Sequence, residues 1–191
     1  FNIKILIVLE KDDLETIDSI KDFNCDILYQ SNKGYGDALI QGINNTKTKY
    51  FCIFNADGSF VSNELKEMYS LLENKHSDFV FGSRYMKNAS SDDDTLITYV
   101  GNKIFSFIGN LFFSLEISDI LYTYVMGNTE SAQSLNLKEK KFSLCVELPI
   151  KAKRSGFKLI SFPCHERKRF AGKKKVNAFK DGFLILISMV K

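Results

Sequence analysis

The segment from Phe51 to Phe60, FCIFNADGSF, contains the carboxylate that is best placed for chemistry in this sequence. Residues 50–54 form an aromatic and β-branched run of the length of a buried strand, and the following Asn-Ala-Asp-Gly favours a turn. Ligands of open α/β sheets bind at the carboxyl ends of the strands, so Asp57 lies where a divalent cation and a phosphate can meet. Taken alone, these ten residues are better explained as a simple turn before a helix capped by Ser62.

Basic residues form the second chemical feature, because they gather in the C-terminal third of the chain. From Lys138 to Lys175 there are thirteen Lys and Arg against three Glu, although the formal net charge of the whole chain is only +3. This distribution predicts that the region faces phosphates or an anionic membrane surface. A solvated basic face without a partner is the alternative. A nucleic-acid partner is not expected, because the basic run matches no recognition module.

Length and composition indicate one α/β domain that spans residues 1–191. Hydrophobic residues make up 45% of the 191 residues, which is enough for a core. Four cysteines without paired spacing and two isolated histidines argue against disulfides and a zinc site, and favour a reducing, cytoplasmic compartment. The chain starts without Met in a strand-like run, Ile3 to Leu9, so we expect that an N-terminal strand and a nucleotide-binding turn precede it.

Strands that alternate with helices predict a doubly wound, mostly parallel sheet. Strands are expected at 3–9, 26–29, 50–54, 78–84 and 157–162, and helices at 14–20, 37–45, 62–72, 95–115, 142–153 and 177–190. The first strand should be fully buried, and residues 117–128 should be irregular. The helix at 95–115 carries so many Phe residues that part of its surface is expected to contact lipid or a partner, with core packing as an equal alternative.

Five segments resemble, in the same order, the family 2 inverting glycosyltransferases of the GT-A fold, and particularly the dolichyl-phosphate mannose synthase-like branch, which glycosylates polyprenyl phosphates. These segments are NKGYGDA (32–38), NADGS (55–59), DFVFGSR (78–84), ISD (117–119) and residues 163–175. The resemblance covers nearly the whole chain. It implies a nucleotide-diphosphate sugar as donor, and a polyprenyl phosphate or a glycan as acceptor.

The resemblance also implies a divalent metal, Mg²⁺ or Mn²⁺, at the position of the family's D-x-D signature. Here that signature is occupied by Asn55 and Asp57, so one ligand is a carboxylate and the other an uncharged amide. A cation held there would stabilise the diphosphate that accumulates charge as the glycosyl bond breaks. The family's Asp-Asp-Gly-Ser is replaced by Glu10-Lys-Asp-Asp13, one of whose acids is expected to meet the base or the ribose. The implied donor-binding residues are Asp12, Asp13, Lys33, Gly34, Asn55, Asp57 and Arg84.

A phosphate clamp is implied by the basic run. Arg167 and Arg169 match the family's Arg-x-Arg, and Gly172 and Lys175 match the Gly-x-Ser-Lys pattern that follows, with Lys174 in place of Ser. Guanidinium groups suit phosphate oxygens, and a glycine allows the loop to approach them closely. The clamp would order over the donor diphosphate or the acceptor phosphate, whereas the alternative is a solvated loop.

The acceptor decides whether a general base is needed. A polyprenyl phosphate is already an anion, so the enzyme would need no base and would work at the cytoplasmic face of a membrane, in peripheral contact with its anionic surface. A glycan hydroxyl must lose a proton, and Asp119 is then the first candidate base and Glu147 the second. Asp119 could instead order the loop after it, and Glu147 could be a buried partner of an Arg. A third possibility is a degenerate domain that binds nucleotide sugar without turnover.

Overall fold

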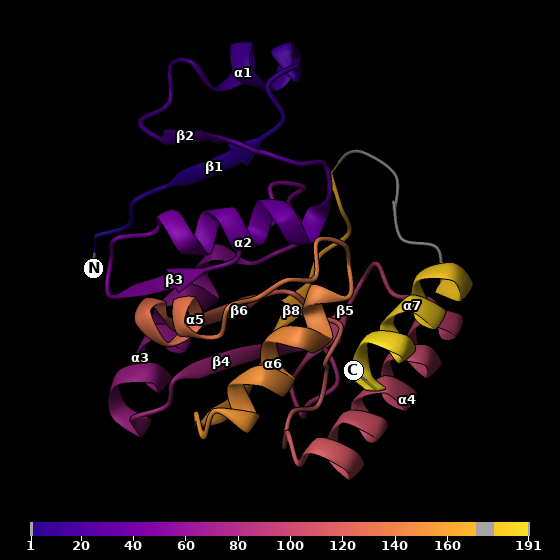
Figure 1. Cartoon of the computed structure of the whole chain (residues 1–191). Coiled ribbons are helices and arrows are strands. Elements are labelled where there is room, and N and C mark those ends of the chain that lie inside the picture. Colours follow the sequence, from indigo (N-terminus) through magenta and orange to yellow (C-terminus); the bar gives the residue numbers. More distant parts are fainter. Residues whose placement is uncertain (1, 171–177, 191) are drawn as a thin grey trace.

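The protein folds as an α/β domain, shown by a computed structural model that describes residues 2–170 and 178–190 (Figure 1). In chain order the elements are β1 (Leu6–Leu9), α1 (Leu14–Ile20), β2 (Asp26–Tyr29), α2 (Tyr35–Asn45), β3 (Tyr50–Cys52), the 3₁₀ turn η1 (Ser62–Glu64), α3 (Leu65–Lys75), β4 (Phe79–Ser83), β5 (Ser90–Ser91), α4 (Leu96–Phe113), β6 (Val125–Asn128), α5 (Thr129–Ser134), α6 (Leu144–Arg154), β7 (Leu159–Pro163), β8 (His165–Glu166) and α7 (Ala178–Val190).

The strands form one four-stranded sheet and two strand pairs. The large sheet has the order β3-β6-β4-β7, in which β4 and β7 are parallel and β6 runs antiparallel to both neighbours. The pairs β1-β2 and β5-β8 are parallel. The expected α/β fold is therefore confirmed, with one antiparallel strand inside the sheet.

That antiparallel strand, β6, corrects the expectation that residues 117–128 are irregular. Its sequence Val-Met-Gly-Asn contains two turn-favouring residues, which hide the strand from a search for β-formers. Gly127 is needed for packing, because a Cβ atom there would lie 2.5 Å from Cδ1 of Phe79 and 3.0 Å from Cε1 of Phe51. The rings of the two neighbouring strands thus fill the space of the missing side chain.

The first strand is also different from the expectation of full burial. In β1 only Leu9 is buried, and Ile3 and Ile5, which precede the strand, are 55% and 54% exposed. The reason is its position: among the described residues, β1 pairs with β2 alone and β3 pairs with β6 alone. One edge of each strand is therefore left without a strand partner in this part of the chain.

Alternate residues of the sheet face two hydrophobic clusters, one on each side. Phe79 and Phe81 of β4 belong to the cluster that includes α6, whereas Val80 belongs to the cluster that includes Met68 and Leu72 of α3. Helices therefore cover both sides of the large sheet and bury its strands. The four cysteines are free thiols, as their spacing predicts.

Most of the expected helices are confirmed within a few residues. Ser143 stands at the N-cap of α6 as expected, although its side chain makes no capping hydrogen bond, whereas Ser62 begins the turn η1 and Glu64 stands at the N-cap of α3. Helix α5 was not expected. Helices α4 and α7 pack together (Figure 1). A Cβ atom on Gly182 would lie 3.8 Å from the ring of Phe105.

Candidate active site

Asp57 lies in the loop that follows β3, and this loop fixes its carboxylate. Its Oδ1 accepts hydrogen bonds from the backbone N–H of Ser59 at 3.0 Å and from the Ser59 hydroxyl at 2.6 Å. Gly58 between them has a φ of +81°, a conformation that glycine adopts without strain. One carboxylate oxygen is thus held by the loop itself, and Oδ2 is the oxygen that faces Arg169.

The segment that contains Arg167 and Arg169 runs along this loop. The backbone N–H of Arg167 donates to the carbonyl of Ser59 at 2.9 Å, and that of Phe170 donates to the carbonyl of Asp57 at 2.7 Å. A Cβ atom on Gly58 would lie 3.3 Å from Cβ of Phe170, so the two backbones are in close contact. Two segments more than 100 residues apart in the sequence therefore meet where the sequence analysis required them to meet.

Arg169 lies between two carboxylates. Its Nη1 is 3.8 Å from Oδ2 of Asp57, and its Nη2 is 3.2 Å from Oδ2 of Asp93. About a quarter of the side chain of Arg169 and of Asp57 is exposed, so solutes can reach both groups. A divalent cation at Asp57 would compete with this guanidinium, and a diphosphate beside it would attract the same guanidinium.

Asn55, the second predicted metal ligand, is held by a residue that the sequence analysis did not select. The hydroxyl of Tyr35 donates to Oδ1 of Asn55 at 3.1 Å and lies 2.8 Å from Oγ1 of Thr123. Burial raises the pKa of Tyr35 to about 12, so the phenol keeps its proton at neutral pH. The feature of the sequence that could have identified Tyr35 as a site residue is its position between two glycines.

A metal ion fits this donor set only with help from other ligands. A carboxylate and an amide oxygen are suitable ligands for Mg²⁺ or Mn²⁺. Among residues 2–170 and 178–190, however, no group of three or more His, Cys, Asp or Glu side chains could hold an ion. Water and the diphosphate would therefore have to supply most of the coordination at Asp57 and Asn55.

The glycines of the Gly-Tyr-Gly segment serve close packing. A Cβ atom on Gly34 would lie 2.4 Å from the carbonyl oxygen of Lys140, and one on Gly36 would lie 2.2 Å from that of Glu139. Gly34 also has a φ of +140°, which side chains rarely allow. Contact between Gly34 and a donor phosphate stays a prediction.

The acidic residues after β1 lie with Lys33 at the surface. The Lys33 ammonium is 2.7 Å from Oε2 of Glu10 and 3.6 Å from Oδ2 of Asp12. Asp13 caps α1, because its Oδ1 accepts a hydrogen bond from the backbone N–H of Thr16. The structure therefore brings Lys33 and Asp12 together and gives Asp13 a local structural contact.

Arg84 and Asp119 form a buried ion pair. Nε and Nη2 of Arg84 bind the two carboxylate oxygens of Asp119 at 2.7 and 3.0 Å, and Nη1 lies 3.2 Å from Oε2 of Glu166. Burial lowers the pKa of Arg84, but the two carboxylates outweigh it and raise that pKa above its ordinary value. Burial raises the pKa of the Asp119 carboxyl, against the effect of Arg84. The donor-binding residue and the base predicted from the sequence thus bind each other in the interior.

Glu147, the second candidate base, is also engaged. Its carboxylate accepts hydrogen bonds from the backbone N–H groups of Lys138 and Glu139 at 2.7 to 3.0 Å and lies 2.7 Å from the ammonium of Lys151. The cation beside it is therefore a Lys, whereas an Arg was considered. Gly172 and Lys175 lie outside the described residues.

Two further acids of the site were missed by the sequence analysis. Asp93 belongs to the acidic run before α4, and Glu166 stands alone within the basic run. Two features of the sequence could have revealed them. Glu166 stands beside arginines, and Asp93 lies in a run of three Asp residues before a helix.

Asp57 follows a strand of the α/β sheet and lies across from Arg169, whereas the guanidinium of Arg167 donates to the carbonyl of Phe60 at 2.8 Å. A carboxylate suits a divalent cation and a guanidinium suits phosphate oxygens. The sequence model of Glycosyl transferase family 2 matches residues 2–135, and this chain belongs to that family. It is thus a family 2 glycosyltransferase, as the sequence resemblance implied.

Known relatives agree with this assignment. A protein of Mycobacterium bovis and one of Mycobacterium tuberculosis, both described as uncharacterized glycosyltransferases, are each 24% identical over 161 residues, which are 84% of this chain and 72% of theirs. Glucosyl-3-phosphoglycerate synthase from Mycobacterium tuberculosis, solved with Mn²⁺, UDP and phosphoglyceric acid, superposes with a TM-score of 0.70 at 11% identity over 98% of this chain and 66% of that one. Mannosyl-3-phosphoglycerate synthase from Rubrobacter xylanophilus gives 0.63 at 13% identity, over 98% and 62%. These structures show the same fold.

Proposed function

We propose that this protein transfers a sugar from a nucleotide-diphosphate donor to a polyprenyl phosphate, with inversion at the anomeric carbon and with Mg²⁺ or Mn²⁺. The observation that carries the proposal is the contact between Asp57 and Arg169, because it unites a metal-binding carboxylate with a phosphate-binding guanidinium. The backbone bonds from Arg167 and Phe170 to the Asp57 loop hold the two groups at one place.

The chain's own residues would act as follows. Arg169 would bind the donor diphosphate, Asp57 and Asn55 would hold the cation through their side-chain oxygens, and the hydroxyl of Tyr35 would keep Asn55 in position. The bound metal would neutralise charge on the leaving diphosphate. An acceptor oxygen then attacks the anomeric carbon from the opposite side, so one C–O bond forms as the bond to the diphosphate breaks, and the electron pair leaves with the diphosphate.

The acceptor is proposed to be a phosphate because the candidate bases are occupied. Both oxygens of Asp119 bind Arg84, and both oxygens of Glu147 accept backbone hydrogen bonds. A phosphate oxygen is already an anion and needs no base. The dolichyl-phosphate mannose synthase-like branch, with its lipid phosphate acceptor, is therefore our preferred assignment within the family.

Transfer to a hydroxyl is the second candidate, favoured by one observation on similar folds. The two solved synthases are named for 3-phosphoglycerate products, and one of them was solved with phosphoglyceric acid. A hydroxyl acceptor in this chain would require Asp119 to separate from Arg84 before it could accept a proton. A glycan acceptor would make the same demand.

A transfer screen with radiolabelled sugars tests these proposals. The protein is incubated with several nucleotide sugars and with a polyprenyl phosphate, 3-phosphoglycerate or an oligosaccharide, in Mn²⁺, Mg²⁺ or EDTA. We expect a labelled lipid product that requires the metal and Asp57, whereas Asp18→Ala, in an exposed ion pair on α1, should leave it unchanged. If the only labelled product is water-soluble, the acceptor is 3-phosphoglycerate or the oligosaccharide and the lipid acceptor is rejected. Donor binding without any product would establish a non-catalytic domain.

A further inference from the structure

Helix α4 turns both polar and apolar residues toward the protein. Its fully buried residues are Asn102, Ser106 and Gly109, and Phe105, Ile108 and Phe113 are partly buried against the core. The hydroxyl of Ser106 accepts a hydrogen bond from the backbone N–H of Ile120 at 3.0 Å, and a Cβ on Gly109 would lie 2.9 Å from Cδ1 of the same Ile120. A surface helix in water normally turns its apolar stripe inward. Here small and polar residues share the inward side with three apolar ones, and most of the apolar residues of the helix are exposed.

The outward side of α4 and the adjacent α7 is apolar. Of the four Phe residues noted in the sequence, Phe105 and Phe113 pack against the core, whereas Phe107 and Phe112 are 66% and 71% exposed. We define the α4–α7 apolar face as the exposed residues Leu96, Ile97, Tyr99, Val100, Ile104, Phe107, Leu111, Phe112, Phe183, Leu186 and Ile187. Such a contiguous patch marks a contact surface and is unusual on a protein surrounded by water.

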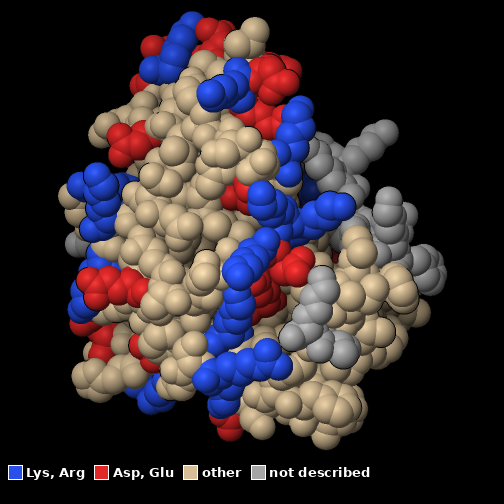
Figure 2. All heavy atoms as spheres, viewed as in Figure 1, with Lys and Arg blue, Asp and Glu red and all other residues tan. Residues whose placement is uncertain are grey.

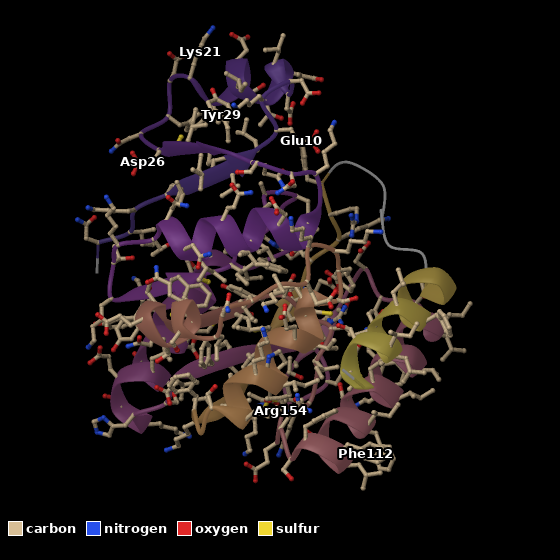
Figure 3. All side chains as sticks on the ribbon, in the orientation of Figure 1. Glu10, Lys21, Asp26, Tyr29, Phe112 and Arg154 are labelled. Atoms are coloured by element: carbon tan, nitrogen blue, oxygen red, sulfur yellow. The ribbon has the colours of Figure 1, made fainter. Side chains whose placement is uncertain are left out.

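Among the residues whose side chains are described, charge is sparse on this face and lies at its border. Lys103 is the one charged residue of α4, and its ammonium lies 4.9 Å from the ring centre of Tyr85 and 5.7 Å from that of Tyr99. The guanidinium of Arg154 lies 5.3 Å from the ring centre of Phe113. Figure 2 shows Lys and Arg side chains in a band beside a region that bears no described charged residue, and Figure 3 shows Arg154 and Phe112 toward the same end of the molecule.

We propose that the α4–α7 apolar face docks on the anionic surface of a lipid membrane. Apolar side chains enter the boundary between headgroups and acyl chains, while Lys103 and Arg154 meet lipid phosphates and Tyr99 lies at the interface. A second copy of the chain would also cover apolar area, and the ultracentrifugation experiment below tests that alternative.

The helix lies along the membrane and does not cross it. By length and composition the 18 residues of α4, with a mean hydropathy of 1.2, would suffice to span a bilayer. However, the side-chain amide of Asn110 makes two hydrogen bonds with the backbone of Ile117: its NH2 group donates to the carbonyl, and its oxygen accepts from the N–H. Asn102 donates to the hydroxyl of Tyr85 at 2.7 Å. These bonds attach the polar side of α4 to the folded domain along its length, so only the opposite side can enter lipid.

The face is continuous with the candidate active site. The Asp94 carboxylate accepts hydrogen bonds from Tyr85 and from Thr98 in the first turn of α4, and its neighbour Asp93 binds Arg169. Phe170, next to Arg169, is 94% exposed. A membrane in contact with α4 would thus present a lipid phosphate beside Arg169. This last step rests on the proposed function, whereas the docking itself does not.

Vesicle flotation tests the docking without any donor or acceptor. We compare vesicles of phosphatidylcholine with phosphatidylglycerol against vesicles of phosphatidylcholine alone, using wild type, Phe107→Ser/Phe112→Ser, and the control Leu14→Ser/Phe23→Ser, which removes similarly exposed apolar groups from the region of α1. We expect binding to anionic vesicles that the first variant lowers about tenfold or more, with no change in the control. Circular dichroism confirms that each variant is folded.

The outcomes separate this inference from the proposed function. Equal vesicle binding by wild type and Phe107→Ser/Phe112→Ser would overturn the docking, even if sugar transfer to a polyprenyl phosphate occurs in detergent. Vesicle binding that requires Phe107 and Phe112, without transfer to any lipid, would overturn the proposed transfer to a polyprenyl phosphate and support the membrane-docking role of the face. Analytical ultracentrifugation without lipid tests for a second copy. A concentration-dependent dimer that the wild type and the control form, but Phe107→Ser/Phe112→Ser does not, would assign the face to a second copy of the chain.

Discussion

Arg84 binds both carboxylate oxygens of Asp119, at 2.7 and 3.0 Å, in a site where the carboxylate is fully shielded from water. The guanidinium also lies over the ring of Tyr122, 4.5 Å from its centre. This pair connects the strand β4 to the segment before β6, two neighbours in the sheet. A residue with the sequence context of a general base is therefore, in this conformation, the internal partner of an arginine.

Asp119→Asn should destabilise the fold. The change leaves the buried guanidinium of Arg84 without one of its two countercharges, a loss that typically costs about 3–5 kcal/mol. For a domain of this size we expect a Tm lower by roughly 10 °C, measured by calorimetry. Asp18→Asn, at an exposed pair, should change the Tm by less than about 1 °C. An Asp119→Asn protein with an unchanged Tm but no transfer to a hydroxyl acceptor would instead identify Asp119 as the base.

Asp57→Ala should abolish metal-dependent turnover while the fold persists. The backbone carbonyl of Asp57, which binds Phe170, is retained, but the carboxylate that would hold the cation is lost. We expect kcat/KM to fall by about 10²–10³ and the dependence on Mn²⁺ concentration to disappear. Steady-state assays over a Mn²⁺ series measure this. Full activity in the variant would remove Asp57 from the mechanism.

Arg169→Lys tests the phosphate clamp. Lysine keeps the charge but loses the planar fork that suits phosphate oxygens, so kcat/KM should fall by about tenfold. Asp93→Asn removes one of the two partners of Arg169, and we expect a change mainly in the KM for the donor. The neighbouring exposed Lys168→Gln is the matched control and should behave as wild type. If the changes at 168 and 169 have equal effects, Arg169 makes no specific contact with phosphate and the loop contributes only its positive charge.

Glu64 should make stability depend on pH. Burial raises the pKa of its carboxyl above the ordinary value, and Oε1 accepts a hydrogen bond from the backbone N–H of His165 at 2.8 Å. As the pH rises from about 4.5, the unfolded chain loses this proton first, so the native state holds more protons and the free energy of unfolding falls.

Glu64→Gln removes this titration and keeps an acceptor for His165. Its Tm should equal that of wild type near pH 4 and exceed it at pH 7, because only the wild-type protein must then ionise a partly buried carboxyl. Thermal melts of both proteins between these two pH values decide the point. Parallel Tm curves would show that Glu64 has an ordinary pKa.

Gly127→Ala should destabilise the centre of the sheet. The new methyl group would meet the rings of Phe79 and Phe51 at 2.5 and 3.0 Å, and such overpacking costs about 1–3 kcal/mol. Gly101→Ala is the matched control, because no atom lies within 4 Å of a Cβ there and the residue is in α4. We expect this second change to stabilise by about 0.5–1 kcal/mol. Urea unfolding of both variants measures the difference.

The local features of this protein can be predicted from its sequence. The aromatic run before Asn55, the helices with regular apolar spacing and the turn at Asp57 depend on contacts between residues a few positions apart, and all of them are found in the structure. The excess of Phe in α4 was visible in the same way, but not the fact that two of these residues pack inward and two face outward.

Tertiary structure alone decided which distant groups meet. Gly127 looks like a strand breaker until the rings of Phe79 and Phe51 fill its place, and Asp119 looks like a base until Arg84 binds it. Strand order and register set these contacts, because they bring together segments separated by tens of residues, beyond the reach of local propensity. The same long-range pairing places Arg169 beside Asp57, and so creates the candidate active site from two segments that are far apart in the sequence.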